Sequence, residues 1–220
     1  MGLFDFFKGK RKKKKADPAK EPAALMDLDD SGIAGIEPPE TRYTQEYQDF
    51  LAAREAAEQE ERSGMKTLVA YFSASGVTAA VAGRLAEAIG APLYEIRPAV
   101  PYTEEDLNWR DRQSRSSLEM QDKACRPALG DTAAPVGDAE RIFLGYPVWW
   151  YREPSIIDTF LEAYDFKGKR IILFATSGTS GIGDEAPARI AELSGAEVLP
   201  GKRFPADVSR DELKAWAESL

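Results

Sequence analysis

The stretch TLVAYFSASGVTAAVAGRLAEAIG, residues 67–90, contains an apolar run, a short polar turn and an amphipathic pattern, in that order. The apolar run at 67–72 is typical of a buried strand, and apolar residues at helical spacing over 77–89 predict an α-helix. A strand followed directly by a helix is the first unit of an alternating α/β fold. The stretch therefore predicts an α/β domain, provided that strands and helices go on alternating after it.

That alternation continues to the end of the chain. Two of the runs, RIFLGYP at 141–147 and RIILFATS at 170–177, are almost wholly apolar, as are strands buried on both faces. Five strands that alternate with helices imply a doubly wound parallel sheet with helices on both faces. The expected strands are 67–72, 93–96, 141–146, 170–175 and about 196–199, and the expected helices are 77–89, about 104–121, 154–164, 184–194 and 209–219.

The polar turn inside the opening stretch holds Ser73, Ser75 and Thr78 around Gly76. The first N–H groups of a helix have no partner within it, so this turn can bind an anion, of which a phosphate is the natural example. It lacks the lysine of a P-loop and the GxGxxG of a dinucleotide site. We expect a terminal monophosphate held by neutral donors; the alternative is a helix cap with incidental serines.

The loop after the third expected strand is aromatic. Its sequence, YPVWWY at 146–151, has four aromatic residues among six. Ligands of a doubly wound sheet bind at the carboxyl ends of the strands, where such a cluster forms a stacking surface for a flat ring. The alternative is packing beneath a neighbouring loop, and one of the two adjacent tryptophans is free to point into the core.

The loop after the fourth expected strand is small and polar. It reads TSGTSGIG at 176–183, and its glycines expose backbone N–H groups that suit ring carbonyls and nitrogens. The alternative is a flexible surface loop. Phosphate donors, an aromatic platform and a glycine-rich loop at one edge of a sheet together describe a site for flavin mononucleotide (FMN).

From Met65 to Leu220 the sequence resembles a flavodoxin. More narrowly, it is similar to short bacterial flavodoxin-like proteins with the motifs PYxxDLNW and GYPxWW, which read PYTEEDLNW at 101–109 and GYPVWW at 145–150 here. The resemblance implies the strand order 2-1-3-4-5 and FMN as the cofactor. It implies phosphate contacts from Ser73, Ser75, Gly76, Val77 and Thr78, ring contacts from Pro147, Val148, Trp149 and Trp150, and loop contacts from Thr176, Ser177, Gly178, Ser180, Gly181 and Gly183.

The sequence departs from the family pattern at one position, and one region has a second interpretation. Val77 stands where the family loop usually has asparagine, which removes one side-chain hydrogen bond worth about 0.5–1.5 kcal/mol. The region 106–120 is a helical region near the flavin by resemblance. The residues alone also allow a solvated helix with a pair between Arg115 and Glu119, four positions apart.

The first 64 residues have a different composition. Residues 1–40 read as a basic and then proline-rich disordered tail and linker, 41–64 as a peripheral helix, and 65–220 as the FMN-binding domain. Residues 1–15 combine MGLFDFF with a run of lysines, so we weigh contact with an anionic membrane surface against a solvated tail. No apolar run is long enough for a transmembrane helix.

Charge and composition narrow the function. The net charge of −8 divides into +6 on residues 1–15 and −14 on the rest, which argues against nucleic acid and suits a partner protein with a basic face. The single cysteine fits a reducing, cytoplasmic location. The chain has no histidine, which removes the commonest general base and any Ser–His pair.

A flavin would supply the redox chemistry, so a protein without these groups can still be a redox protein. The favoured interpretation is an FMN-binding electron-transfer protein. The alternatives are an FMN-dependent NAD(P)H:quinone-type oxidoreductase and a flavin-free interaction module tethered by its N-terminal tail. The lack of a nicotinamide fingerprint weakens the first alternative, and Val77 favours the second.

Overall fold

The structure, a computed structural model, describes residues 48, 52, 66–178 and 180–220. Gln48 and Ala52 are helical and exposed. The tail and linker at 1–40, the membrane-contact hypothesis and the rest of 41–64 lie outside the described residues. Within the described part, no helix has both the length and the apolar character needed to cross a membrane.

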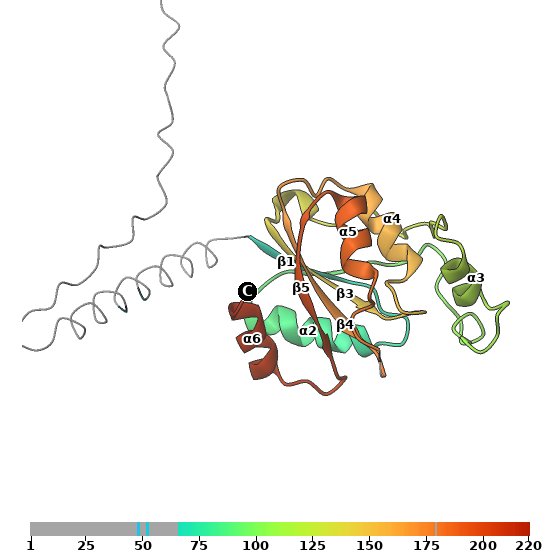
Figure 1. Ribbon diagram of the computed structural model, residues 1–220, viewed down its shortest axis with the longest axis horizontal. Helices are drawn as coiled ribbons and strands as arrows, with labels where there is room; N and C mark the ends of the chain where they lie inside the picture. Colours follow the sequence, from blue (N-terminus) through green and yellow to red (C-terminus); the bar gives the residue numbers. More distant parts are fainter. Residues whose placement is uncertain (1–47, 49–51, 53–65, 179) are drawn as a thin grey trace, which may run out of the picture. The chain divides into compact units, whose positions relative to one another are not determined.

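The expected doubly wound sheet is confirmed. Its strands lie in the order β2-β1-β3-β4-β5, and each adjacent pair is parallel (Figure 1). The order reverses at β1, so the carboxyl ends of β1 and β3 flank the switch point where ligands of such sheets bind. The strands are β1 (Thr67–Tyr71), β2 (Leu93–Glu95), β3 (Arg141–Pro147), β4 (Arg170–Thr176) and β5 (Glu197–Phe204).

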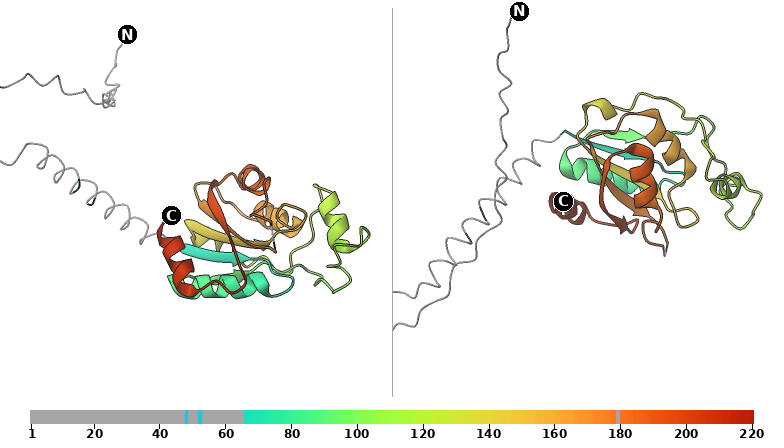
Figure 2. Two further views of the ribbon diagram at one scale, coloured as in Figure 1. Left: turned by 60° about the horizontal axis from the view of Figure 1, so that its bottom comes forward. Right: turned by 45° about the horizontal axis from the view of Figure 1, so that its top comes forward.

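Helices cover both faces of the sheet, as the right-handed crossovers require (Figures 1 and 2). On one face, Leu68 and Ala70 belong to the apolar core shared with α4 and α5; on the other, Val69 and Tyr71 pack with α2 and α6. This alternation follows from the two-residue repeat of a strand. The helices are α2 (Val77–Ile89), α3 (Arg115–Gln121), α4 (Ser155–Ala163), α5 (Ala186–Ser194) and α6 (Arg210–Glu218).

Gly145 in the middle of β3 is required by packing. A Cβ atom added there would lie 2.2 Å from the ring of Phe174 on β4. Both strands are buried, so neither backbone can move away. The glycine of the GYPVWW stretch therefore lets a phenylalanine ring lie directly on the sheet.

The predicted helix at about 104–121 is wrong over most of its length, because only α3 is helical there. Thr103 and Asp106 bond to each other's backbone N–H groups at 3.2 and 2.9 Å, and Asp111 accepts from Gln113 N–H at 2.8 Å. Such side chains compete with helical hydrogen bonds and favour turns. The helix α3 begins only at Arg115, after Ser114, whose side chain caps it. It lies beyond the strand ends, apart from the sheet (Figure 2).

Candidate functional site

The loop after β1 leads into α2 without a side-chain cap. Gly76 is the N-cap residue with φ 83°, a left-handed conformation that suits glycine, and a Cβ atom added to it would meet nothing within 4 Å. Ser75, Gly76 and Val77 are exposed. The first N–H groups of α2 thus lie at an open surface, as an anion site requires.

The hydroxyl group of Ser73 is the clearest sign of a ligand in this loop. Its Oγ atom is buried and has no hydrogen-bond partner in the described part of the chain. A buried polar atom without a partner is costly, and native proteins rarely keep one without a reason. An oxygen atom of a bound group would satisfy it.

Thr78 joins the first loop to the third. Its side chain is 1% exposed, and its Oγ1 lies 2.8 Å from Oγ1 of Thr176 at the end of β4. The backbone oxygen of Thr176 also accepts a hydrogen bond of 3.0 Å from Val148 N–H in the second loop. The loops after β1, β3 and β4 therefore meet at Thr176.

The two adjacent tryptophans of the second loop have different surroundings. Trp149 packs edge-on against Phe72 and Tyr102, with ring centroids 5.6 and 5.3 Å apart. Trp150 is 46% exposed and Tyr151 is 72% exposed. The inward orientation that the sequence allowed for one tryptophan belongs to Trp149, while Trp150 and Tyr151 form the accessible aromatic surface. Pro147, the last residue of β3, and Val148, which follows it, are half-buried.

The exposed aromatic pair forms the centre of a tight hairpin turn. Trp149 and Arg152 exchange two backbone hydrogen bonds of 3.0 Å, and φ is 46° at Trp150 and 66° at Tyr151. Positive φ at both central residues defines a type I′ turn, which normally contains Asn or Gly. A left-handed conformation costs an ordinary residue roughly 1–2 kcal/mol, so this turn is strained.

The glycines of the third loop differ in surroundings. Gly178 and Gly181 are exposed, and added Cβ atoms there would meet nothing within 4 Å. Gly183 is buried with φ 95°, and an added Cβ would lie 2.8 Å from the backbone oxygen of Tyr151. Gly183 therefore packs the third loop against the aromatic turn, and only the first two glycines offer open backbone to a ligand.

Polar contacts fix this third loop. Ser177 Oγ donates to the backbone oxygen of Ser180, and Tyr146 OH donates to that of Ile182 at 2.9 Å. Burial holds the pKa of Tyr146 well above its ordinary value, so its hydroxyl remains a donor. Arg203 on β5 donates to the oxygen of Ser177 at 3.1 Å and brings a cation to the loop that the sequence interpretation missed.

The segment before α3 also reaches the site. The ring of Tyr102 contacts Trp149, its hydroxyl donates to Glu119, and Arg115 lies 4.1 Å above its ring. Arg115 and Glu119 are paired at 2.7 Å, as the four-residue spacing suggested. The solvated-helix interpretation is nevertheless wrong, because Glu119 is only 8% exposed. Tyr102 lies within the PYTEEDLNW stretch, which was the available signal.

A buried ion cluster lies directly behind the aromatic turn and was not predicted. It contains Arg152, Glu153, Asp158 and Arg189, and both carboxylates are fully buried. Burial, together with the nearby Asp158 carboxylate, raises the pKa of Glu153 to about 7. The residues come from the turn, α4 and α5, so no local sequence pattern indicates the cluster.

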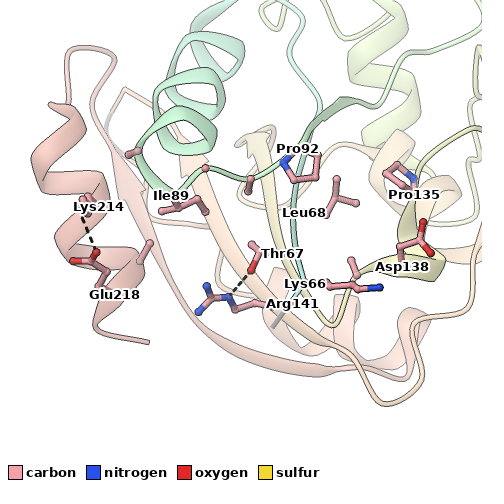
Figure 3. Close-up of a pocket in the computed structure, with 15 residues that line it drawn as sticks. Lys66, Thr67, Leu68, Ile89, Pro92, Pro135, Asp138, Arg141, Lys214 and Glu218 are labelled. Carbon is pink, nitrogen blue, oxygen red and sulfur yellow. Dashed lines mark hydrogen bonds and ion pairs between the residues drawn. The ribbon is translucent and has the colours of Figure 1, made fainter. Parts of the chain in front are cut away.

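A hollow of about 770 Å³ lies at the amino ends of β1 and β3, at the opposite end of the sheet from the three loops (Figure 3). It is lined by Lys66 and Thr67 at the start of β1, Arg141 at the start of β3, and Lys214 and Glu218 of α6. None of the predicted site residues lines it. The candidate site is thus a group of converging loops at the carboxyl ends of the strands. No group of metal-ligating side chains occurs among the residues that the structure describes.

Known proteins resemble this chain closely. A family profile described as flavodoxin matches residues 66–220. A crystal structure described as a flavoprotein from Bacteroides uniformis is 45% identical, with a TM-score of 0.65, over 70% of this chain and 97% of the other. A second crystal structure, from Bacteroides eggerthii, is 39% identical, with a TM-score of 0.67, over 71% of this chain and 98% of the other.

A more distant flavoprotein from Lactobacillus acidophilus, solved in complex with FMN, is 22% identical, with a TM-score of 0.52. It covers 70% of this chain and 99% of its own length, and at this identity it supports the fold alone. Among curated proteins, none matches the chain.

Proposed function

Because residues 66–220 belong to the flavodoxin family, we propose that this chain binds FMN at the carboxyl ends of β1, β3 and β4 and carries electrons between other proteins. The observation that carries the proposal is the meeting of three loops at Thr176, with an unpartnered Ser73 hydroxyl on one side and exposed aromatic rings on the other. When bound, FMN supplies the redox chemistry, and the chain supplies position and electrostatics.

The loop after β1 fits the phosphate group. Ser73 Oγ is the buried hydroxyl without a partner, Ser75 is an exposed hydroxyl beside it, and Gly76 leaves the start of α2 open. These donors are neutral, so binding relies on N–H and O–H groups rather than on a positive side chain. The buried Thr78 hydroxyl holds the loop against Thr176.

The aromatic turn fits the flat ring system. Trp150 and Tyr151 offer exposed rings, and Trp149, the residue before them, packs against Phe72 and Tyr102. The open backbone of Gly178 and Gly181 suits the polar edge of the same ring. These groups bind and orient the ring and shield one part of it from water.

The charge of the chain supports transfer to a protein partner. Residues 16–220 carry a net charge of −14, which attracts a partner with a basic face and speeds encounter at low salt. The tail at 1–15 has the opposite charge. We include in the proposal that this tail binds an anionic membrane surface, so that the carrier works beside membrane-bound partners.

The experiment that tests the function is an absorption spectrum between about 300 and 550 nm, followed by titration with FMN. Reduction is then measured with NADPH alone and with an added flavodoxin reductase over a range of salt concentrations. A carrier is reduced only with the reductase, at a rate that falls as salt rises. Reduction by NADPH alone supports the quinone-reductase alternative. A colourless protein that does not bind added FMN supports the flavin-free module and contradicts the proposal.

The membrane part is tested separately by co-sedimentation with anionic and neutral liposomes at low salt. The intact chain should bind the anionic vesicles, and a chain without residues 1–15 should not. Failure of the intact chain to bind would exclude membrane contact and leave the FMN proposal untouched.

A further inference from the structure

The aromatic turn is held in a conformation that its residues disfavour. Trp150 and Tyr151 both have positive φ, at 46° and 66°, although each carries a bulky side chain. Type I′ turns favour Asn and Gly because other residues are strained in the left-handed region. Contacts outside the turn must therefore select this conformation over a relaxed one.

Arg152 provides such contacts at the end of the turn. Its side chain is only 5% exposed. Its guanidinium donates to the backbone oxygen of Glu153 at 3.1 Å and to Ser155 Oγ at 3.2 Å, and it lies 3.6 Å from Asp158 Oδ2. Since Arg152 N–H and C=O both bond to Trp149, fixing this side chain fixes one leg of the hairpin.

Arg189 closes the cluster from α5. It lies 3.2 Å from Glu153 Oε1 and 2.6 Å from Asp158 Oδ2, and it also donates to the backbone oxygen of Lys123 at 2.8 Å. The cluster thus connects the turn, α4, α5 and the segment after α3. Gly183 packs the third loop against the backbone of Tyr151 and Arg152.

The cluster is a poor source of stability in itself. Glu153 Oε2 and Asp158 Oδ1 are buried without a hydrogen-bond partner in the described part of the chain. A buried ion pair recovers its desolvation cost only when its atoms are fully satisfied, and an apolar replacement is often as stable. A role in selecting one conformation explains the cluster better than a role in overall stability.

We propose that the buried cluster of Arg152, Glu153, Asp158 and Arg189 positions the aromatic turn for stacking on the flavin ring, with Arg152 as the positioning residue. The cluster acts through Trp150 and Tyr151. This inference rests on the proposed function, because the stacked ring is the flavin of that proposal. Beyond that function, it assigns control of flavin affinity to charged residues behind the turn.

The first test measures FMN affinity of the full chain by flavin fluorescence for Arg152→Gln, Arg152→Lys and a matched control, Arg126→Gln. Arg126 also lies 3.6 Å from Asp158 Oδ2, but it bonds to Glu162 and not to the turn. We expect Arg152→Gln to weaken FMN binding about ten-fold or more, the lysine variant to recover part of the loss, and the control to stay within about two-fold.

A folded Arg152→Gln variant that binds FMN as tightly as the control overturns the inference. If Arg152→Gln does not fold, Ser155→Ala takes its place, because it removes one acceptor of Arg152, together with the bond from this hydroxyl to the backbone oxygen of Glu119, without leaving a charge unpaired. The expected loss of FMN affinity is then about three-fold, close to that for one hydrogen bond. An unchanged affinity again contradicts the inference.

The second test needs no flavin, so it distinguishes failure of this inference from failure of the proposed function. Unfolding of the flavin-free full chain by urea is compared for wild type, Tyr151→Gly, Arg152→Gln and the double variant. Glycine relieves the strain of a left-handed residue, so Tyr151→Gly should lower the unfolding equilibrium constant about ten-fold in wild type. In the Arg152→Gln background, where the turn relaxes, the same change should lower the unfolding equilibrium constant by less than about three-fold. An equal gain in both backgrounds, or none in wild type, overturns the inference.

Discussion

The loop after β1 and the turn after β3 lie at the same end of the sheet, but they are held in different ways. In the first, the strained position is occupied by Gly76, which tolerates φ 83°, and the following helix fixes the rest. In the second, Trp150 and Tyr151 occupy left-handed positions, and a buried ion cluster and Gly183 hold them there. The first loop is thus specified locally, and the second by contacts distant in sequence.

This difference has consequences for mutation. Changes to the serines of the loop after β1 should weaken ligand binding without destabilising the fold, because the Ser73 hydroxyl has no hydrogen-bond partner in the described part of the chain and Ser75 is exposed. Changes around the turn should reduce stability where they disturb packed groups, as at Gly183 and Trp149, and should act on binding alone at the exposed Trp150.

Gly183→Ala should be the most damaging single change in the three loops. The new Cβ atom would lie 2.8 Å from Tyr151 O and 2.9 Å from Arg152 Cα, at a residue with φ 95°. We expect the free energy of unfolding to fall by about 3 kcal/mol, as for an overpacked and strained site. Urea denaturation measures this loss.

Gly178→Ala in the same loop is the matched control. A Cβ atom there would meet nothing within 4 Å, so the free energy of unfolding should change by less than about 0.5 kcal/mol. Similar losses for both variants would show that Gly183 is not a packing contact for the turn.

Replacing Trp149 should reduce mainly the stability of the fold, whereas replacing Trp150 should weaken mainly FMN binding. Trp149→Ala removes a ring packed against Phe72 and Tyr102 and should cost about 2–3 kcal/mol of stability, less than for a fully buried ring. Trp150→Ala removes an exposed ring and should change stability by less than about 0.5 kcal/mol. It should weaken FMN binding by about 1 kcal/mol through lost stacking.

Urea denaturation and FMN titration of both variants provide the measurements. If Trp150→Ala destabilised the fold as much as Trp149→Ala, the division into a supporting and a stacking ring would be wrong. Unchanged FMN affinity in Trp150→Ala would remove that residue from the stacking surface.

Glu153 should make stability depend on pH. Burial raises its pKa to about 7 from an ordinary value of 4.5, so between these values the folded chain holds a proton that the unfolded chain has released. The stabilisation is complete below pH 4.5, the pKa of Glu153 in the unfolded chain, and it is lost as pH rises through about 7. Glu153→Gln cannot ionise, so its free energy of unfolding relative to wild type should increase from about pH 5 to pH 8.

The expected increase is about 2.5 kcal/mol, since one pKa unit corresponds to about 1.4 kcal/mol and about two pH units lie between pH 5 and the pKa of about 7 in the folded chain. Urea denaturation of both proteins across this pH range measures it. A decrease instead would show that the ionised carboxylate stabilises the cluster.

Sequence patterns predicted the helices and strands that are determined by residues close together in the chain. The apolar runs at β3 and β4 and the helical spacing over 77–89 gave those elements within one or two residues. The edge strand β5 extends to Phe204, beyond the expected end at about 199, because it includes polar residues that an edge strand can expose. The early start expected for α3 was wrong because turn-forming side chains precede Ser114.

The amino-acid composition of the three loops likewise indicated the candidate site, but it did not predict how the loops are arranged. Nothing in the pair Trp149 and Trp150 distinguishes the inner ring from the outer one, because the backbone conformation of the turn decides it. That conformation depends on Asp158 and Arg189, which lie on two different helices. A pattern read along the chain cannot bring such residues together.

The smallest effect should come from the loop after β1. Ser73→Ala removes a buried hydroxyl without a partner, so the flavin-free protein should become more stable by about 1 kcal/mol. The same change removes a donor to the phosphate and should weaken FMN binding by about 1 kcal/mol. Ser75→Ala, at an exposed position, should leave stability within about 0.5 kcal/mol and serves as the control. Opposite signs for stability and binding at Ser73 would identify its hydroxyl as a group kept for the ligand, whereas a loss of stability would mean that the hydroxyl supports the loop itself.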